Sequence, residues 1–460
     1  MTRLIVTFAC LSCLVACAEP PAEAPYSASS PNLILIIGDG MDDHQITIAR
    51  NYLVGNAGRL TLDDMPFRGM VQVQTVDNTN PAVPRYVGDS ASGATAMATG
   101  QPTAEGRIST AAKTNEHLPT IMEMARAAGM RTGIVTTSRI TDATPASFVA
   151  HMSNRYCEMP RGMVREDPII PQDSTDCSAE FIANGGSGSI VEQIVNLDID
   201  IYLGGGAGRF TDFIEGSDSI TIRDAAVANS FRIIESGSEL MGDLGQGKIL
   251  GLFTDGHMPE RMRGGVADFI ERVNGVPQWP EAFGCEPNPA FGDTPSLAAM
   301  TRVALDRLDS HEGFLLVVES ASIDKAMHYW RPCGHIGEME QLDEAVEVSL
   351  DYAAVNRSTL VLVTADHGQT AQLLPHTSGL APQQFAPTGR FARVRTPEDG
   401  IMGIGYASND SPHWEDHTGV QVPLYAAGPR VDGLPHYLLQ SDIFHIAATH
   451  LGLGDTWPAE

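Results

Sequence analysis

Short apolar runs recur along the chain, each bounded by glycine, proline or polar residues. The first, Asn32–Ile37, lies between Pro31 and Gly38 and has the pattern of a strand that is buried on both faces. Similar runs follow at Thr132–Thr137, Ile199–Leu203, Lys248–Phe253, Gly313–Glu319, Thr359–Thr364 and Val422–Ala427. Segments with helical spacing separate them, including Leu118–Ala128, Ser296–Leu308 and Gln341–Val355. The alternation predicts an α/β fold, a three-layer sandwich in which helices flank a large, mostly parallel central sheet.

The chain divides into a short leader and one long folded region. No internal repeat or low-complexity linker interrupts residues 32–455, so the pattern favours one large domain over two. Before it, Arg3 precedes an apolar run, Leu4–Ala16, that is too short to span a bilayer as a helix but fits the core of a signal peptide. We expect residues 1–16 to be a signal peptide. Residues 17–31, rich in Ala, Pro, Ser and Glu, are expected to be a flexible tether.

The end of the apolar run bears on the expected location. Leu14-Val15-Ala16-Cys17 resembles the lipobox of bacterial lipoproteins, in which cleavage before the cysteine leaves a lipidated N-terminal residue. The alternative is ordinary cleavage at Ala16-Cys17-Ala18. The lipobox interpretation predicts an exported protein that is attached to a membrane, such as the outer membrane, through a lipid on Cys17. The alternative predicts a freely soluble periplasmic or secreted protein.

The charge balance excludes one class of partner. The chain has 29 Lys and Arg residues against 57 Asp and Glu residues, a formal net charge of −28. A protein this acidic is not attracted to nucleic acid or to an anionic membrane surface, so we expect no nucleic-acid binding. Any anionic substrate must be bound by local positive charge.

The cysteines fall into two groups. Three lie in the leader, and four lie in the folded region, at Cys157, Cys177, Cys285 and Cys333. Export makes two disulfides plausible, and neighbourhood along the chain suggests Cys157–Cys177 and Cys285–Cys333. Four cysteines allow three connectivities, and four free thiols are the remaining alternative.

Polar residues follow three of the predicted strands at the point where each strand ends. Asp39 follows the first strand, Glu319 ends another, and Asp366-His367 closely follow a third. In open α/β sheets the carboxyl ends of the strands are where ligands and catalytic groups gather. The three strands are therefore expected to deliver acids and a histidine to one edge of the sheet.

Two further segments supply metal-binding side chains. Asp324 and His328 are four residues apart, so on a helix they share a face, and Zn²⁺ accepts both carboxylate oxygen and imidazole nitrogen. Asp416-His417 supplies another imidazole. Each pair alone could be an ordinary surface feature. Together with the strand-end residues they exceed what one tetrahedral zinc needs, and sites with two metals are suited to phosphoryl displacement.

A helix rich in small residues is expected to begin at Ser90. Its N-terminus is a natural place for a phosphate, because the helix dipole is positive there. The structural alternative is a tightly packed helix with a capping serine. A second hypothesis is a serine esterase, since Gly88-Asp89-Ser90 resembles the GDS motif at the start of some lipases. The G-x-S-x-G motif that presents the nucleophilic serine in α/β-hydrolases is missing around Ser90.

The combination of segments resembles bacterial alkaline phosphatases. The resemblance extends from about residue 32 to 455 and is carried, in the family's order, by the strings NLILIIGDGM, YVGDSASGATAMATG, DATPASFVAHMSNRYC, VESASIDKAMH, CGHIGEMEQLDEAVE, LVTADHGQT and DHTG. It implies hydrolysis of phosphate monoesters through a phosphoserine at a site with two zinc ions and one magnesium ion. It also implies a homodimer and the two neighbouring disulfide pairs.

The resemblance assigns a role to each position in these strings. Ser90 would be the nucleophile, next to Asp89, and Arg155 would bind the phosphate. One zinc would be held by Asp324, His328 and His417, the other by Asp39, Asp366 and His367, and magnesium by Asp39, Thr144 and Glu319. Asp142 and Lys325 would surround the magnesium and phosphate positions. In relatives with this acid and lysine the third ion is magnesium, so we expect magnesium here.

Two other functions remain open at this point. Superfamily cousins cleave phosphodiesters or sulfates on this type of fold, although the C/S-x-P-x-R context of sulfatases is absent around Ser90. From a different class, the chain could be a catalytically silent lipoprotein that binds metal or phosphate. Hydrolysis of a chromogenic phosphate monoester that EDTA abolishes would distinguish the enzyme from the binding protein.

Overall fold

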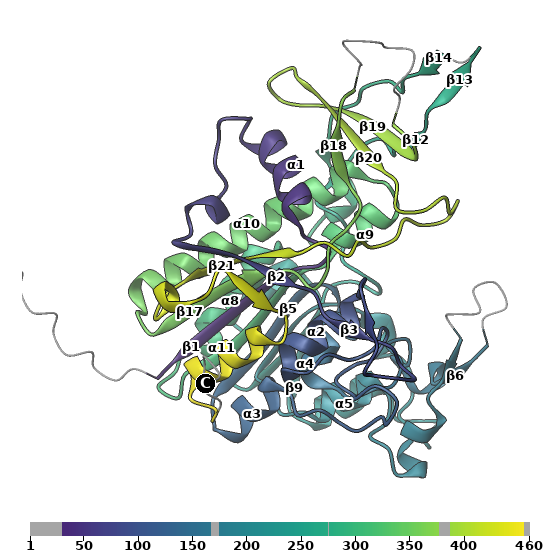
Figure 1. Ribbon diagram of the computed structural model, residues 1–460. Helices are drawn as coiled ribbons and strands as arrows, with labels where there is room; N and C mark the ends of the chain where they lie inside the picture. Colours follow the sequence, from purple (N-terminus) through teal and green to yellow (C-terminus); the bar gives the residue numbers. More distant parts are fainter. Residues whose placement is uncertain (1–29, 167–173, 275, 377–386, 455–460) are drawn as a thin grey trace, which may run out of the picture.

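A ten-stranded sheet forms the centre of the protein (Figure 1). The structure is a computed structural model and describes residues 30–454 except 167–173, 275 and 377–386. Across the sheet the strands lie in the order β22 (Tyr437–Leu439), β2 (Phe67–Gln72), β21 (Val422–Ala427), β17 (Thr359–Thr364), β1 (Asn32–Gly38), β16 (Phe314–Ser320), β5 (Arg131–Arg139), β8 (Ile201–Gly205), β10 (Lys248–Leu252) and β9 (Phe231–Ile234). Among the strands described, β21 alone runs antiparallel to its neighbours in this sheet. The predicted mostly parallel sheet is confirmed.

Helices cover both faces of the sheet, which confirms the three layers (Figure 1). One face is covered by α1 (Asp43–Leu53), α8 (Leu297–Leu308) and α10 (Pro332–Val355). The other is covered by α2 (Ser90–Thr99), α3 (Ile121–Ala127), α4 (Ala143–Val149), α5 (Ile190–Asn196) and α11 (Asp442–Leu451). The short helix α9 (Ser322–His328) connects β16 to α10, and α6 (Ile222–Ala228) packs on the edge strand β9. α7 (Gly237–Leu240) precedes β10.

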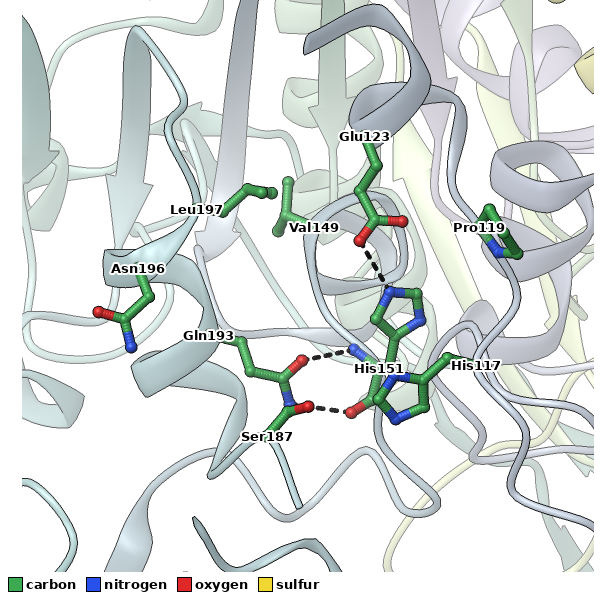
Figure 2. Close-up of a pocket in the computed structure, with 9 residues that line it drawn as sticks. All are labelled: His117, Pro119, Glu123, Val149, His151, Ser187, Gln193, Asn196 and Leu197. Carbon is green, nitrogen blue, oxygen red and sulfur yellow. Dashed lines mark hydrogen bonds and ion pairs between the residues drawn. The ribbon is translucent and has the colours of Figure 1, made fainter. Parts of the chain in front are cut away.

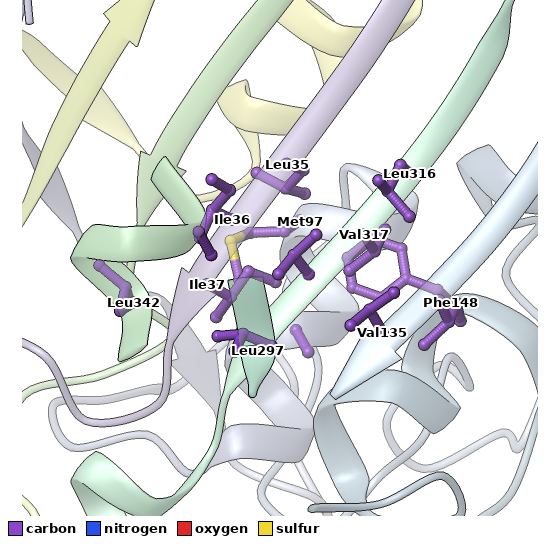
Figure 3. Close-up of a cluster of buried hydrophobic side chains, with 14 of the residues drawn as sticks. Leu35, Ile36, Ile37, Met97, Val135, Phe148, Leu297, Leu316, Val317 and Leu342 are labelled. Atoms are coloured by element: carbon purple, nitrogen blue, oxygen red, sulfur yellow. The ribbon is translucent and has the colours of Figure 1, made fainter. Parts of the chain in front are cut away.

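The core lies between the sheet and these two helical layers (Figure 3). Ile36 and Ile37 of β1 and Val317 of β16 are buried, because the central parallel strands have a helical layer on each side. Leu342 comes to this core from α10, and Phe148 comes from α4 on the opposite layer. Burying one such side chain stabilises the fold by about 1.5–3 kcal/mol. The core therefore fixes the central strands whose ends carry the polar residues.

A second, smaller sheet stands apart from the first, at the top of Figure 1. It is antiparallel and has the order β12 (Asp268–Phe269), β19 (Arg390–Arg395), β20 (Ile401–Tyr406) and β18 (Gln372–Leu374). The sequence patterns did not predict it. Four short strand pairs complete the described strands: β3–β4 (Thr75–Val76 with Pro84–Arg85), β6–β7 (Val164–Arg165 with Thr175–Asp176), β11–β15 (Met262–Arg263 with Glu286–Pro287) and β13–β14 (Glu271–Val273 with Val276–Gln278).

Both neighbouring cysteine pairs are disulfides, Cys157–Cys177 and Cys285–Cys333. The expected signal peptide, Cys17 and most of the expected tether lie outside the described residues, as does residue 455 at the expected end of the domain. In the part of the chain that the structure describes, no helix combines the length and the apolar character needed to cross a membrane.

Candidate active site

The three strands that end in polar residues lie side by side. β1 pairs with β16 on one side and with β17 on the other, and Ile37 is level with both Glu319 and Thr364. This register brings the carboxyl ends of the three strands to one edge. The backbone N–H of Gly40, beyond β1, donates to Asp366 Oδ1, beyond β17, at 3.1 Å. The predicted meeting of these strand ends is confirmed.

Asp39, Asp366 and His367 form one group of possible metal ligands, which we call the Asp39 cluster. Their ligand atoms lie within 4.8 Å of one another, and His367 Nε2 is 3.3 Å from Asp39 Oδ1 and 3.7 Å from Asp366 Oδ2. All three side chains are buried. Burial and the neighbouring charge of Asp39 raise the pKa of Asp366 well above its usual value. A cation at this position would stabilise the ionised form of Asp366.

Asp324, His328 and His417 form a second group, the His417 cluster. Asp324 and His328 share a face of α9 as predicted, and His328 Nε2 lies 3.1 Å from Asp324 Oδ2. His417 comes from the segment before β21, with its Nε2 atom 3.5 Å from Asp324 Oδ1 and 3.1 Å from His328 Nε2. Burial, followed by the nearby His367, lowers the pKa of His417 to about 4, so its imidazole is neutral and able to bind a metal.

The two clusters adjoin each other. The rings of His367 and His417 stack with their centroids 3.7 Å apart. Sequence reasoning did not single out Gln369, whose amide donates to Asp324 Oδ1 at 2.7 Å and so orients a carboxylate of the second cluster. The available signal was its place in the string TADHGQT, two residues beyond His367.

Ser90 is the first residue of α2 and lies against the Asp39 cluster. Asp89 caps this helix by accepting from the backbone N–H of Ser92 at 3.0 Å. The Ser90 hydroxyl donates to Asp39 Oδ1 at 3.4 Å and lies 3.3 Å from His367 Nε2. Every residue of α2 is buried, because its small side chains let it pack closely. The expected helix start therefore brings a hydroxyl to a group of possible metal ligands.

Glu319 and Thr144 carry buried oxygen atoms next to this site. Thr136 and Ser138 both donate to Glu319 Oε2, the latter at 3.1 Å. The other carboxylate oxygen, Oε1, has no hydrogen-bond partner among the described residues, and neither has the Thr144 hydroxyl at the start of α4. Burial raises the pKa of Glu319 to about 7 although Lys325 opposes the shift.

A chain of charges connects the remaining predicted residues. Lys325 Nζ lies 3.2 Å from Asp39 Oδ2 and 3.0 Å from Asp142 Oδ2. Arg155 lies 3.0 Å from Asp89 Oδ2 through Nη1 and 3.4 Å from Asp142 Oδ1 through Nη2. Burial opposes ionisation of Asp142, but the surrounding cations, Lys325 first and then Arg139, together outweigh it and hold the pKa of Asp142 well below its usual range. The two acids thus keep both cations charged and in place.

Part of this site lines a cavity of about 1110 Å³, whose lining includes Ser90, Arg155, Lys325, His328 and His417. The exposed side chains of Tyr329 and Trp414 lie at its edge. A second cavity of about 440 Å³ shares no lining residue with the first (Figure 2). There Gln193 bonds the backbone of His151, and His151 Nε2 lies 3.0 Å from Glu123, so these polar groups satisfy one another.

The residues present fit bound cations. Asp366 Oδ2, Glu319 Oε1 and Thr144 Oγ1 are buried acceptors without a hydrogen-bond donor among the described residues, and such atoms are costly unless something binds them. The nitrogen and carboxylate donors of the Asp39 and His417 clusters suit zinc. The oxygen donors Glu319 and Thr144 suit magnesium.

Comparison with known proteins identifies the family. The sequence pattern of the alkaline phosphatase family matches residues 30–398. The chain belongs to the alkaline phosphatase family. It is 38% identical over 430 residues to alkaline phosphatase from Escherichia coli K12, covering 92% of this chain and 86% of the relative. It is also 37% identical over 454 residues to streptomycin-6-phosphate phosphatase from Streptomyces griseus, covering 96% and 95%.

Solved alkaline phosphatases share the fold. The structure of the enzyme from the Antarctic bacterium TAB5 matches with a TM-score of 0.64 at 23% identity, covering 92% of this chain and 98% of that one. The enzyme from a psychrophilic Shewanella species gives a TM-score of 0.64 at 22% identity, covering 91% and 99%. As a member of this metal-dependent family, the protein is a phosphoric monoester hydrolase.

Proposed function

We propose that this phosphatase acts through a phosphoserine formed at Ser90, in a site that holds two zinc ions and one magnesium ion. The observation that carries the proposal is the position of the Ser90 hydroxyl, 3.4 Å from Asp39 Oδ1 and 3.3 Å from His367 Nε2. A serine hydroxyl is a weak nucleophile at its own pKa and needs an adjacent base or a metal ion. Here the groups beside it are metal ligands, and no esterase-type base-and-acid pair is required.

Three groups of residues would hold the ions. The Asp39 cluster would bind one zinc, the His417 cluster the other, and Asp39 with Thr144 and Glu319 the magnesium. When bound, such ions supply Lewis-acid stabilisation to the serine oxygen and to the leaving oxygen. Asp142 and Lys325 would favour magnesium at the third position, because they place a carboxylate and an ammonium group beside it and magnesium prefers oxygen donors.

The chain's own residues set the reaction geometry. Arg155, fixed by Asp89 and Asp142, offers its remaining N–H groups to two phosphate oxygens and so orients the phosphorus towards Ser90. The Ser90 Oγ–phosphorus bond forms, the ester phosphorus–oxygen bond breaks, and the alcohol leaves with the proton that Ser90 gives up. A water molecule then cleaves the phosphoserine, which regenerates the hydroxyl and releases inorganic phosphate.

The proposal is tested with Ser90→Ala, with Ser187→Ala, an exposed serine in the second cavity, as the matched control. Acid quench during turnover of p-nitrophenyl phosphate, followed by peptide mass spectrometry, should find phosphate on Ser90 in the native chain and in the control. The Ser90→Ala protein should carry none. Phosphate trapped on another residue of Ser90→Ala would overturn the assignment.

Metal content tests the cofactor part. Elemental analysis of the purified protein should give two zinc and one magnesium per chain, and EDTA should abolish hydrolysis until both metals are returned. The substrate panel should include a phosphodiester, on which turnover should be far slower. It should also include streptomycin 6-phosphate, because a close relative is named for that substrate.

Location and assembly belong to the same proposal. We infer an exported homodimer, in the periplasm or held at the outer membrane by a lipid on Cys17. Mass spectrometry of the mature N-terminus distinguishes a lipidated Cys17 from cleavage after Ala18. Light scattering after gel filtration gives the number of chains per particle.

A further inference from the structure

Glu415 is a buried acid two residues before His417, between β20 and β21, with 2% of its surface exposed. Its Oε1 atom accepts from the backbone N–H and hydroxyl of Ser408 at 2.5 and 2.7 Å and from the backbone N–H of Asn409 at 3.1 Å. Its Oε2 atom accepts from the indole N–H of Trp330 at 2.7 Å. A buried carboxylate bound by four donors is held in one orientation, and removing one donor there costs more than at the surface.

The backbone of Glu415 is tied to His328 at two points. The N–H of Glu415 donates to the carbonyl oxygen of His328 at 2.9 Å, and the carbonyl oxygen of Glu415 accepts from His328 Nδ1. Because Nδ1 carries the proton in that bond, the ring of His328 is oriented with Nε2 towards Asp324 and His417, 3.1 Å from each. A hydrogen bond on the far nitrogen of a metal-binding histidine fixes its tautomer and its ring orientation.

The same carboxylate anchors the segment that carries His417. Ser408, bound to Glu415, also accepts from the backbone N–H of Asp416 at 2.9 Å. Asp416 in turn accepts from the backbone N–H of His417 at 2.9 Å. Glu415 therefore bonds the ring of His328 directly and reaches the backbone of His417 through Ser408 and Asp416, while His417 Nδ1 lies 2.9 Å from the carbonyl oxygen of Gly88.

Trp330 reaches this carboxylate from an unusual backbone conformation. Its φ is +56°, a left-handed value that a bulky residue adopts only when its surroundings hold it there. The guanidinium of Arg390, in β19, lies 3.8 Å from the centre of the Trp330 ring, and Phe269 of β12 lies on Arg390 at 4.5 Å. The small antiparallel sheet thus packs against the residue that bonds Glu415.

We propose that Glu415 is a positioning residue for the His328–His417 pair and that Trp330 holds its carboxylate in place. The proposal rests on the proposed function in one respect, that His328 and His417 bind zinc. It adds that the small sheet, through Arg390 and Trp330, supports one of the two zinc positions. Residues that orient metal ligands in this way typically change metal affinity by roughly 10- to 100-fold when altered.

The test uses the full mature chain, stripped of metal and titrated with Zn²⁺ against a chelating indicator. Trp330→Phe removes the indole N–H and keeps an aromatic ring for Arg390. Glu415→Gln keeps the shape of the side chain but places an amide N–H against a donor. Trp279→Phe is the matched control, since this ring contacts Phe391 of β19 at 5.5 Å and has no bond to Glu415.

We expect Trp330→Phe and Glu415→Gln each to lower the affinity for one of the two zinc ions by roughly 10- to 100-fold. The affinity for the other zinc ion should not change. The Co²⁺-substituted variants should show an altered visible spectrum for the same equivalent. The double variant should lose no more zinc affinity than the single variant with the larger loss, because both changes break the same contact between Trp330 and Glu415. Trp279→Phe should stay within twofold of the native chain.

Two results would overturn the proposal. One is that both variants bind both zinc ions with native affinity. The other is an equal loss of affinity for both zinc ions, which would indicate that the whole site has become less ordered. If Glu415→Gln does not fold, Trp330→Phe carries the test alone. Failure of the proposed function looks different, because His328→Ala would then retain both zinc equivalents.

Discussion

Arg155→Lys tests the proposed phosphate contact of Arg155 and how much it depends on the shape of the guanidinium. The Arg155 guanidinium has five N–H donors, of which one each is used on Asp89 and Asp142. Enough donors remain to bind two phosphate oxygens side by side. A lysine has three donors on one nitrogen, so keeping both acid contacts leaves one for phosphate.

The substitution therefore removes one charge-assisted hydrogen bond and keeps the charge. Such a bond contributes about 1.5–3 kcal/mol, which corresponds to a roughly 10- to 150-fold change in an equilibrium or rate constant. We expect the inhibition constant for inorganic phosphate to rise by that factor and kcat/KM for p-nitrophenyl phosphate to fall by a similar one. Some turnover should remain, because Ser90 and the metal ligands are untouched.

The assay is steady-state hydrolysis with phosphate as a competitive inhibitor, on protein of verified metal content. Arg59→Lys is the control, because Arg59 is an exposed arginine that pairs with Asp64 on the surface. An inhibition constant within twofold of the native value in Arg155→Lys would refute the argument that the planar two-point contact matters.

Three other changes have distinct expected outcomes. Asp142→His removes one of the two carboxylates that pair with Lys325 and adds an imidazole, so elemental analysis should find zinc replacing magnesium as the third ion. Unchanged magnesium would contradict this. The double variant Cys157→Ser, Cys177→Ser should lower the free energy of unfolding in urea by about 3 kcal/mol, because the disulfide closes a loop across 20 residues. The double variant Cys285→Ser, Cys333→Ser should lower it by about 4 kcal/mol, because its loop spans 48 residues. Equal or reversed losses would argue against the loop-entropy explanation. Burial raises the pKa of Glu338 to about 7, so the native fold binds its proton more tightly than the unfolded chain and loses stability as pH rises from about 4.5 to about 7. Glu338→Gln should therefore raise the melting temperature more at pH 8 than at pH 4, and an equal change at both would contradict the assignment.

The sheet was predictable where strands are buried on both faces. β17 and β21 have the predicted bounds, because such strands form continuous apolar runs. The half-polar strands of the small sheet, such as Arg390–Arg395, have no such run and were missed. α10 begins at Pro332 and not at Gln341, although Gly334 and Gly337 in its first turns are poor helix formers. A Cβ at Gly337 would lie 2.8 Å from the backbone of Met262, so packing of the helix against this segment explains the glycine.

The site was predictable in part for a related reason. The carboxyl ends of parallel strands lie at one edge of a sheet, so the sequence alone allowed Asp39, Glu319 and Asp366 to be grouped. Glu415 and Trp330 could not, because their contact joins two loops far apart in the chain and has no periodicity. The family resemblance placed Asp142 and Lys325 around the same site, but their ion pair was not predicted, since no spacing rule connects a helix to a loop.

The order of the central strands has a consequence for synthesis. Ser90 is made early, but His417 comes long after it, and β21 inserts between β2 and β17 later still. A chain that stops short of residue 417 contains Ser90 and most of the sheet, yet it lacks His417 and the strand that lies between β2 and β17. If the proposed site is correct, hydrolysis requires a chain that has been made past β21.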